Sequence, residues 1–372
     1  MVDYASGAGI VTESGEEMGN RFSKNFVVRV INGNGEREED RDPSDGSKLG
    51  RAGSAYWFNG GGRNHFDSNV AAAVYECEFC YGFKFDNIRN SEFVFPREQG
   101  SDPFMEGGDI VSASTVGIPD FDSNEAYSVP NGLTIWWKCT FGDFPEDNDI
   151  CRSDITSFSV WHHHRLGYFG YPANNMTIEN FVVRGDPSVL VNRFESVTGL
   201  TFSDYMSRNV KIINADIQNV RTAIEMPSMR GSRSESADVG FTTVENSYLV
   251  ASVGLDVLVP ASVNGAVNLP PQTSVIRDVR FASIDPSGEL GTAHIRFNDS
   301  TFFEKNTSLR NDVWIFNYNG APGAGGVDLY AVPGYANQGP DRCDDSIGDC
   351  STEVTDSFGD IRQGHVYPLG EN

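Results

Sequence analysis

Short segments with alternating apolar and polar positions recur along the middle of the chain. Each has a β-branched residue, any residue and a small polar residue, followed by apolar residues one and three positions later. The β-branched column is Ile155, Ile178, Ile212, Val244 and Ile276, and the small polar column is Ser157, Asn180, Asn214, Asn246 and Asp278. A period of two predicts strands, and the 3.6-residue period of a helix is nearly absent from the chain.

The spacing of this repeat predicts a solenoid. The β-branched column advances by 23, 34, 32 and 32 residues, which suits one coil with loops of variable length. We therefore predict an all-β fold, a right-handed parallel β-helix (solenoid). The small polar column is expected at a bend, where side-chain amides hydrogen-bond along the stack.

A second repeat lies upstream of the first, and the repeat pattern ends downstream of it. The pattern Phe-x-x-Asn begins at Phe22, Phe66 and Phe121, and glycine followed by alternating apolar residues appears in "YGFKF" and "NGLTIWW". The segment "GSAYWF" resembles the same element. We predict a parallel β-helix over 1–290, a C-terminal β cap over 291–340 that hides the last open edge, and an acidic C-terminal tail over 341–372.

Composition limits the partners. The formal net charge is -24, which argues against nucleic acid because phosphate binding depends on many cationic contacts. No run of about 18 apolar residues is present, so no membrane span is expected. An acidic chain with few lysines is also typical of a high-salt habitat.

Six cysteines occur as close neighbours: Cys77 with Cys80, Cys139 with Cys151, and Cys343 with Cys350. This favours local disulfides and an extracellular or cell-surface location, although the chain opens without a signal-peptide pattern. A free thiol, or half of a zinc site at Cys77 and Cys80, is the alternative.

The order of several motifs resembles a known family. "GIVTESGEEMGNRFSKN", "GSAYWFNGGGRNHFDSNVAA", "YGFKF", "FDSNEAYSVPNGLTIWW" and "VWHHHRLGYFGYPANNMTIENFVVRG" follow one another from Gly9 to Gly185. Together they resemble the β-helix region of the G8-domain, cell-migration-inducing hyaluronan-binding (cell-surface hyaluronidase) family, without a counterpart of the G8 domain itself. The resemblance implies an extracellular role with glycans, and it supplies no catalytic residues.

The sequence "SVWHHHRLGYFGYP" carries three of the six histidines. The repeat register places Trp161 outward in the column of Arg184, which is a candidate substrate-binding residue, and His162 at the following turn, so that the three rings fan out from the turn. His162 and His164 are candidate sugar-contacting or general-base residues. A metal site and an ordinary turn are the alternatives.

Two further clusters carry candidate chemistry. Glu13 and Glu17 could supply the two carboxylates of glycosidic hydrolysis, or form a solvated acidic turn. Arg63, His65 and Asp67 are expected to face outward together, where a cation and a base would suit β-elimination from an acidic sugar. The chain's negative charge opposes an acidic polymer unless local arginines or bound Ca2+ intervene, so calcium is the one candidate cofactor.

Tryptophans complete the candidate site. Trp57, Trp136, Trp137 and Trp161 lie in the upstream coils and are candidate stacking platforms for sugar rings, with core packing as the alternative. We therefore expect an extracellular protein that acts on a polysaccharide through a lateral groove, as a lyase or a hydrolase. A non-catalytic glycan-binding or adhesion module is the second hypothesis, and a β-helix with a structural role alone is the third. The oligomeric state is not predicted.

Overall fold

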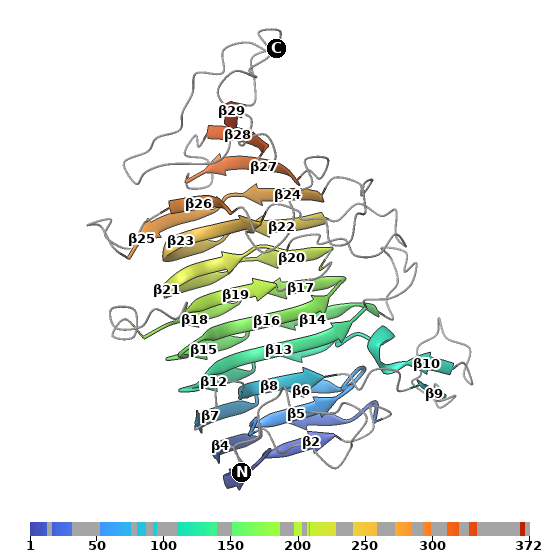
Figure 1. Ribbon diagram of the computed structural model, residues 1–372. Helices are drawn as coiled ribbons and strands as arrows, with labels where there is room; N and C mark the ends of the chain where they lie inside the picture. The colour runs from blue at the N-terminus through green and yellow to red at the C-terminus, as the bar shows by residue number, and fades with distance from the viewer. Residues whose placement is uncertain are drawn as a thin grey trace.

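The computed structural model shows an all-β protein whose strands run parallel in stacked sheets (Figure 1). It describes residues 1–12, 17–31, 53–75, 80–86, 92–94, 110–139, 151–186, 197–202, 207, 209–227, 241–258, 272–284, 293–298, 311–319, 327–332 and 365–368. The sheets are not closed, and the arrangement is compatible with a parallel β-helix or solenoid. A single turn of 3₁₀ helix, η3 (Ala113–Thr115), precedes β11.

The parallel strands form three stacks. Stack one contains β1 (Val2–Ser6), β4 (Phe26–Ile31), β7 (Val70–Tyr75), β12 (Glu125–Tyr127), β15 (Ser159–Trp161), β18 (Val182–Arg184), the first parts of β21 (Asp216–Glu225) and β23 (Tyr248–Leu258), and β25 (Arg280–Ser283). Stack two contains β2 (Ile10–Thr12), β5 (Tyr56–Asn59), β8 (Tyr81–Asp86), β13 (Asn131–Lys138), β16 (Leu166–Ala173), β19 (Thr198–Phe202), the later parts of β21 and β23, and β26 (Ala293–Asn298).

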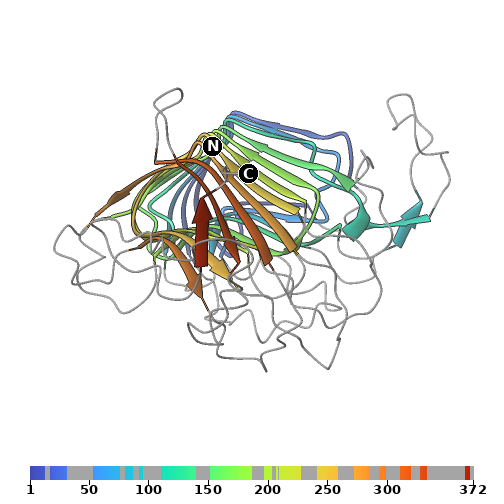
Figure 2. The same cartoon turned by 90° about the horizontal axis from the view of Figure 1, so that it is seen from above.

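Stack three contains β3 (Arg21–Ser23), β6 (His65–Asp67), β11 (Asp120–Asp122), β14 (Ser153–Thr156), β17 (Met176–Glu179), β20 (Val210–Ile213), β22 (Phe241–Glu245), β24 (Gln272–Arg277) and β27 (Asn311–Tyr318). Antiparallel strands β28 (Val327–Val332) and β29 (His365–Pro368) follow β27 in the same sheet, and β9 (Glu92–Val94) pairs with β10 (Ile110–Ser112) separately. Seen from above, strands of successive coils lie over one another around a shared apolar core (Figure 2).

The two columns of the sequence repeat lie where they are expected. Ile155, Ile178, Ile212, Val244 and Ile276 are all buried in the core of stack three. Every member of the small polar column has a positive φ and forms the bend into stack one. Small polar residues tolerate this left-handed conformation, which explains the column. Asn214 Nδ2 donates to Asn180 Oδ1 at 3.2 Å, so these side chains do bond along the stack.

The asparagines of the Phe-x-x-Asn repeat form a second, buried ladder. In each coil they come one position after the small polar column. Asn25 donates to Asn69 Oδ1 through both its backbone and side-chain nitrogens, at 3.0 Å each, and Asn69 donates to Asn124 Oδ1 in the same way, at 2.9 Å. The amides therefore satisfy backbone groups inside the corner. Phe22 and Phe66 stack beside this ladder with ring centroids 5.2 Å apart.

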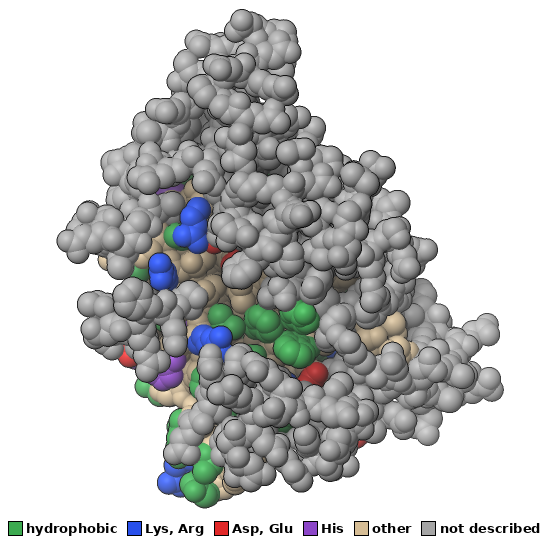
Figure 3. Space-filling model, in the orientation of Figure 1, with side chains coloured by type: hydrophobic (Ala, Val, Ile, Leu, Met, Phe, Trp, Pro, Cys, Tyr) green, Lys and Arg blue, Asp and Glu red, His purple; other side chains and the backbone are tan. Residues whose placement is uncertain are grey.

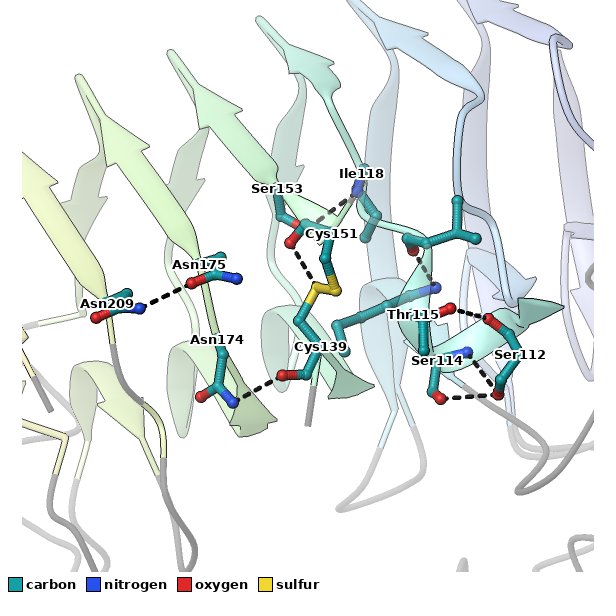
Figure 4. Close-up of a disulfide and its surroundings, with 12 residues drawn as sticks. Ser112, Ser114, Thr115, Ile118, Cys139, Cys151, Ser153, Asn174, Asn175 and Asn209 are labelled. Carbon is teal, nitrogen blue, oxygen red and sulfur yellow. Dashed lines mark hydrogen bonds between the residues drawn. A yellow bond between two sulfur atoms is a disulfide. The ribbon is translucent and has the colours of Figure 1, made fainter. Parts of the chain in front are cut away.

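One predicted disulfide is present, between Cys139 and Cys151 (Figure 4). It joins the end of β13 to the start of β14, and Asn174 Nδ2 donates to Cys139 O at 2.8 Å. Cys80 is also disulfide-bonded. Its predicted partner Cys77, together with Cys343 and Cys350, lies outside the described residues, so those pairings stay predictions. No helix among the described residues has the length and apolar character needed to cross a membrane.

Candidate functional site: the outer row of stack two

The residues predicted to form a site lie on three different walls of the protein. His65 and Asp67 are in β6 of stack three. Trp161 and Arg184 are register partners in stack one, and Trp57 is in β5 of stack two. The structure therefore does not bring these groups into one groove.

On stack three, the alternation of β6 is as predicted. His65 and Asp67 point outward and Phe66 is buried. His65 Nδ1 lies 2.5 Å from Asp120 Oδ2. Asp67 accepts from Ser23 Oγ at 2.8 Å and from Arg21 Nε at 3.1 Å, and these hydrogen bonds, that from Ser23 foremost, lower the pKa of Asp67.

Arg63 and Glu17 take no part in the side-chain hydrogen bonds that His65 and Asp67 make among the described residues. Arg63 is partly buried at a turn with φ 57°, and its backbone N donates to Gly117 O. The guanidinium hydrogen-bonded to Asp67 belongs to Arg21. Glu17 is partly exposed, and its backbone oxygen accepts from Asn64 Nδ2. Glu13 lies outside the described residues.

The three consecutive histidines do not fan out together. His162 is exposed at a turn with φ 53°, as the register predicts, and His164 is exposed. His163 is fully buried, so the prediction that all three rings face outward is wrong for His163. The register explains this, because the equivalent position one residue after the turn holds the buried residues Val74 and Val129 in other coils.

Burial also controls the chemistry of His163. Its Nε2 is 3.1 Å from Thr198 O, and since a carbonyl only accepts, Nε2 carries the proton. Within the described part of the chain, Nδ1 of His163 has no hydrogen-bond partner. Desolvation lowers the pKa of His163 to about 4, so the ring is neutral at neutral pH.

Stack two carries a continuous outward-facing row, which we call the outer row. Parallel register places one residue from each strand directly beside the next along the stack. The outer row consists of Val11, Trp57, Lys84, Thr134, Phe169, Thr201, Glu225, Asp256 and Arg296. The residues on either side of Lys84, Thr134 and Glu225, for example, all belong to the core, as the pleat of a strand requires.

Aromatic side chains form a platform at the middle of the outer row. Trp136 and Tyr171 are register partners with ring centroids 5.3 Å apart, and Phe169 and Tyr171 stack at 6.1 Å with an interplanar angle of 10°. All three are partly exposed. Figure 3 shows hydrophobic side chains gathered at mid-height on this face, in the region of β13 and β16. The side chain of Trp137 lies outside the described residues.

A buried cation supports one edge of this aromatic platform. Lys84 Nζ lies 4.5 Å from the ring centroid of Trp57 and 5.8 Å from that of Trp136, and 3.6 Å from Asp86 Oδ2. Trp57 is on the outer side of its strand, as expected, but it is fully buried. Trp57 is therefore a supporting residue in this structure, because its ring is not available for stacking on a sugar.

Charged groups follow the aromatic platform along the outer row. The Thr201 hydroxyl donates to Glu225 Oε2. Asp256 is 4% exposed, and its carboxylate accepts from Arg296 Nε at 3.1 Å and from Arg296 Nη2 at 2.5 Å. The hydrogen bonds that Arg296 donates to Asp256, with the nearby charges of Asp256 and Glu225, raise the pKa of Arg296. Two carboxylates thus lie on neighbouring strands.

We did not identify Phe169, Tyr171, Glu225 and Asp256 as site residues from the sequence. A repeated pattern that contains Phe169, Glu225 and Asp256 was nevertheless present in the sequence. The "YGFKF" and "NGLTIWW" pattern continues as "LGYFG", "TGLTF", "TAIEM", "VGLDV" and "AHIRF". The polar or variable residue at the fourth position of each copy is the outer-row residue, whereas the third residue points into the core. Extending this repeat would have predicted the outer row.

Comparison with known proteins adds no assignment: no family model, no curated protein and no solved structure matches this chain. The resemblance to the cell-surface hyaluronidase family therefore remains a hypothesis. The described residues contain no group of three or more His, Cys, Asp or Glu side chains arranged to hold a metal ion.

Proposed function

We propose that this protein is an extracellular right-handed parallel β-helix that binds and cleaves a polysaccharide along the outer row of stack two. Right-handedness is supported by the strong preference of parallel strand crossovers for that hand. The antiparallel strands β28 and β29 are suited to act as the C-terminal cap, since they continue the sheet beyond β27. The Cys139–Cys151 disulfide supports an oxidising, extracellular location.

The observation that carries the proposal is the continuity of the aromatic platform with the two carboxylates. Thr134, Phe169, Thr201, Glu225 and Asp256 occupy consecutive strands. Phe169 and Glu225 are the partly exposed members of this run, and they lie two strands apart, about 10 Å at ~4.8 Å per strand. A linear row of this kind suits an extended polymer. Sugar rings would stack on Trp136, Phe169 and Tyr171 and place a glycosidic bond at Glu225.

The chemistry supported best at this point is hydrolysis. Glycosidic hydrolysis uses two carboxyl groups, one of which protonates the leaving oxygen as the C1–O bond breaks. Glu225 is partly exposed and suits this acid role, while Asp256, held by Arg296, would stabilise positive charge at C1. A water molecule then adds to C1 and gives its proton to a carboxylate. Elimination would need a cation for the uronate, and Arg296 is bound to Asp256.

One observation favours the second function, non-catalytic glycan binding. Both oxygens of Asp256 accept from Arg296, and the carboxylate is nearly inaccessible to solvent. These features also suit a purely structural ion pair. In that case the aromatic platform would bind the polymer, and no bond would be broken.

The test is a depolymerisation screen over neutral and acidic polysaccharides, with and without calcium, read by reducing ends and by ultraviolet absorbance of unsaturated products. Hydrolysis gives reducing ends alone, and Glu225→Gln should then lose activity while Glu245→Gln, a partly exposed glutamate of stack three, retains it. Unsaturated products would overturn the hydrolase assignment. Binding that depends on Trp136 without any cleavage would establish the binding module. No cleavage and no binding would overturn the proposal.

A further inference from the structure

Stack one carries a second set of planar side chains, on a different wall from the outer row of stack two. Tyr127, Trp161 and Arg184 come from β12, β15 and β18 and are register partners on consecutive strands. All three point outward, because the alternate residues Ala126, Val160 and Val183 are buried. We call these three residues the stack-one ladder.

The aromatic part of the stack-one ladder is accessible to a ligand. Tyr127 is 45% exposed, a high value for a large ring on a sheet, and Trp161 is partly exposed. The exposed His162 ring stands edge-on to Tyr127, with centroids 5.6 Å apart. His162 directly follows the last residue of β15, at a turn with φ 53°. Exposed aromatic groups gathered on one surface call for a binding partner.

The third member of the ladder is held in a fixed orientation. Arg184 Nη1 donates to Asp216 O at 2.8 Å, and Arg184 Nη2 lies 2.5 Å from Asp216 Oδ2. Gln218 Nε2 donates to the other carboxylate oxygen of Asp216 at 2.7 Å. The guanidinium plane is therefore positioned without a ligand, and Asp216 balances its charge.

We propose that the stack-one ladder is a second carbohydrate-binding surface, separate from the outer row, which takes a neutral polysaccharide. Flat rings suit the apolar faces of sugars, and their polar edges suit sugar hydroxyls. The cation of Arg184 is neutralised by Asp216, so the surface offers no net positive charge to an acidic polymer. The chain's net charge of -24 also disfavours the binding of an acidic polymer.

The inference rests on the proposed function in one respect, namely that the protein binds glycans. Its geometry adds a specific expectation, because the two surfaces lie on different walls. The stack-one ladder should hold a polymer while the outer row of stack two cleaves it, or hold the segment next to the one that the outer row binds. It should contribute to the binding of long chains and have little effect on short oligosaccharides.

The test measures retention in affinity gels that contain arabinoxylan, glucomannan or hydroxyethylcellulose, with polygalacturonate as the acidic comparison. Trp161→Ala and Tyr127→Ala should each weaken binding of a neutral polymer by about fivefold to tenfold. Trp161→Phe keeps a ring and should recover most of the affinity. Tyr248→Ala is the matched control, because Tyr248 is a 36% exposed tyrosine of the same stack. Thermal unfolding of each variant verifies that it folds.

The outcomes separate this inference from the proposed function. Binding that is lost in Trp136→Ala and unchanged in both ladder variants would overturn the stack-one surface and leave the proposed function standing. Binding that is lost only in the ladder variants would support the stack-one surface and overturn the location of the substrate on stack two. Ladder-dependent retention of polygalacturonate alone would overturn the neutral ligand class. If wild-type protein binds none of these polymers, both proposals are overturned.

Discussion

Replacement of His163 by valine should make the protein less sensitive to mild acid. His163 occupies a buried position that other coils fill with valine, so the substitution fits the local packing. It deletes a neutral ring with one hydrogen bond, from Nε2 to Thr198 O, and one unpartnered buried nitrogen, Nδ1, among the described residues. The net effect at pH 7.5 should therefore be small, about 1 kcal/mol or less.

The magnitude follows from the pKa of His163 in the two states. Its pKa is about 4 in the folded protein and 6.5 in an ordinary environment. The unfolded chain therefore takes up a proton first as the pH falls, which makes unfolding more favourable below pH 6.5. At pH 5 this linkage removes about 2 kcal/mol of stability relative to pH 7.5, and the full loss, reached below pH 4, is about 3.4 kcal/mol.

The assay is denaturant unfolding of wild type and His163→Val at several pH values between 7.5 and 5. Other groups titrate alike in both proteins, so the difference between the two curves isolates His163. His163→Val should gain about 2 kcal/mol relative to wild type across this range. His164→Gln, which changes an exposed neighbour, should follow the wild-type curve. Parallel curves for wild type and His163→Val would refute the assignment of a buried, neutral ring.

Four further variants test the packing of the stacks. Gly199→Ala should lower stability by about 1 to 3 kcal/mol in denaturant unfolding, because its Cβ would lie 2.4 Å from the backbone oxygen of the next strand. Asn69→Ala should cost about 3 kcal/mol through loss of the buried ladder, whereas Asn214→Ala on the exposed bend should cost less than about 1 kcal/mol by the same measurement. Replacing Cys139 and Cys151 together by serine removes their disulfide and should lower the free energy of unfolding by about 3 kcal/mol. In this double variant, a reducing agent should cause no further loss of stability from this bond.

The interior of the stacks could be predicted because its rules are local. Ile178 is buried and Asn180 forms the bend, and both follow from alternation within one strand and from the preference of small polar residues for positive φ. The same register places His162 at a turn correctly. Continued one residue further, it would also have placed His163 inside, since the equivalent residue Val129 is buried.

The exposure of outward-facing residues could not be predicted in this way. Alternation tells whether a side chain leaves the core, and Trp57 does so, yet its ring is fully buried. Burial on the outer side of a strand depends on what else packs there, such as Lys84 against the indole. Sequence patterns do not contain that information, which is why Trp57 is not the sugar platform and Trp136 is a better candidate.

The stacking of parallel strands also explains why no short sequence motif identifies a site on the surface of this protein. Each coil contributes one residue to a given outward row, so contacting groups are far apart in the chain: Thr201 and Glu225 are separated by 24 positions, and Asp256 and Arg296 by 40. Consecutive residues instead face different ways: Trp161 points outward from stack one, His162 lies at the turn and His163 is buried. A cluster such as three histidines in sequence is therefore dispersed in space, and a site on this fold is found by comparing equivalent positions of successive coils.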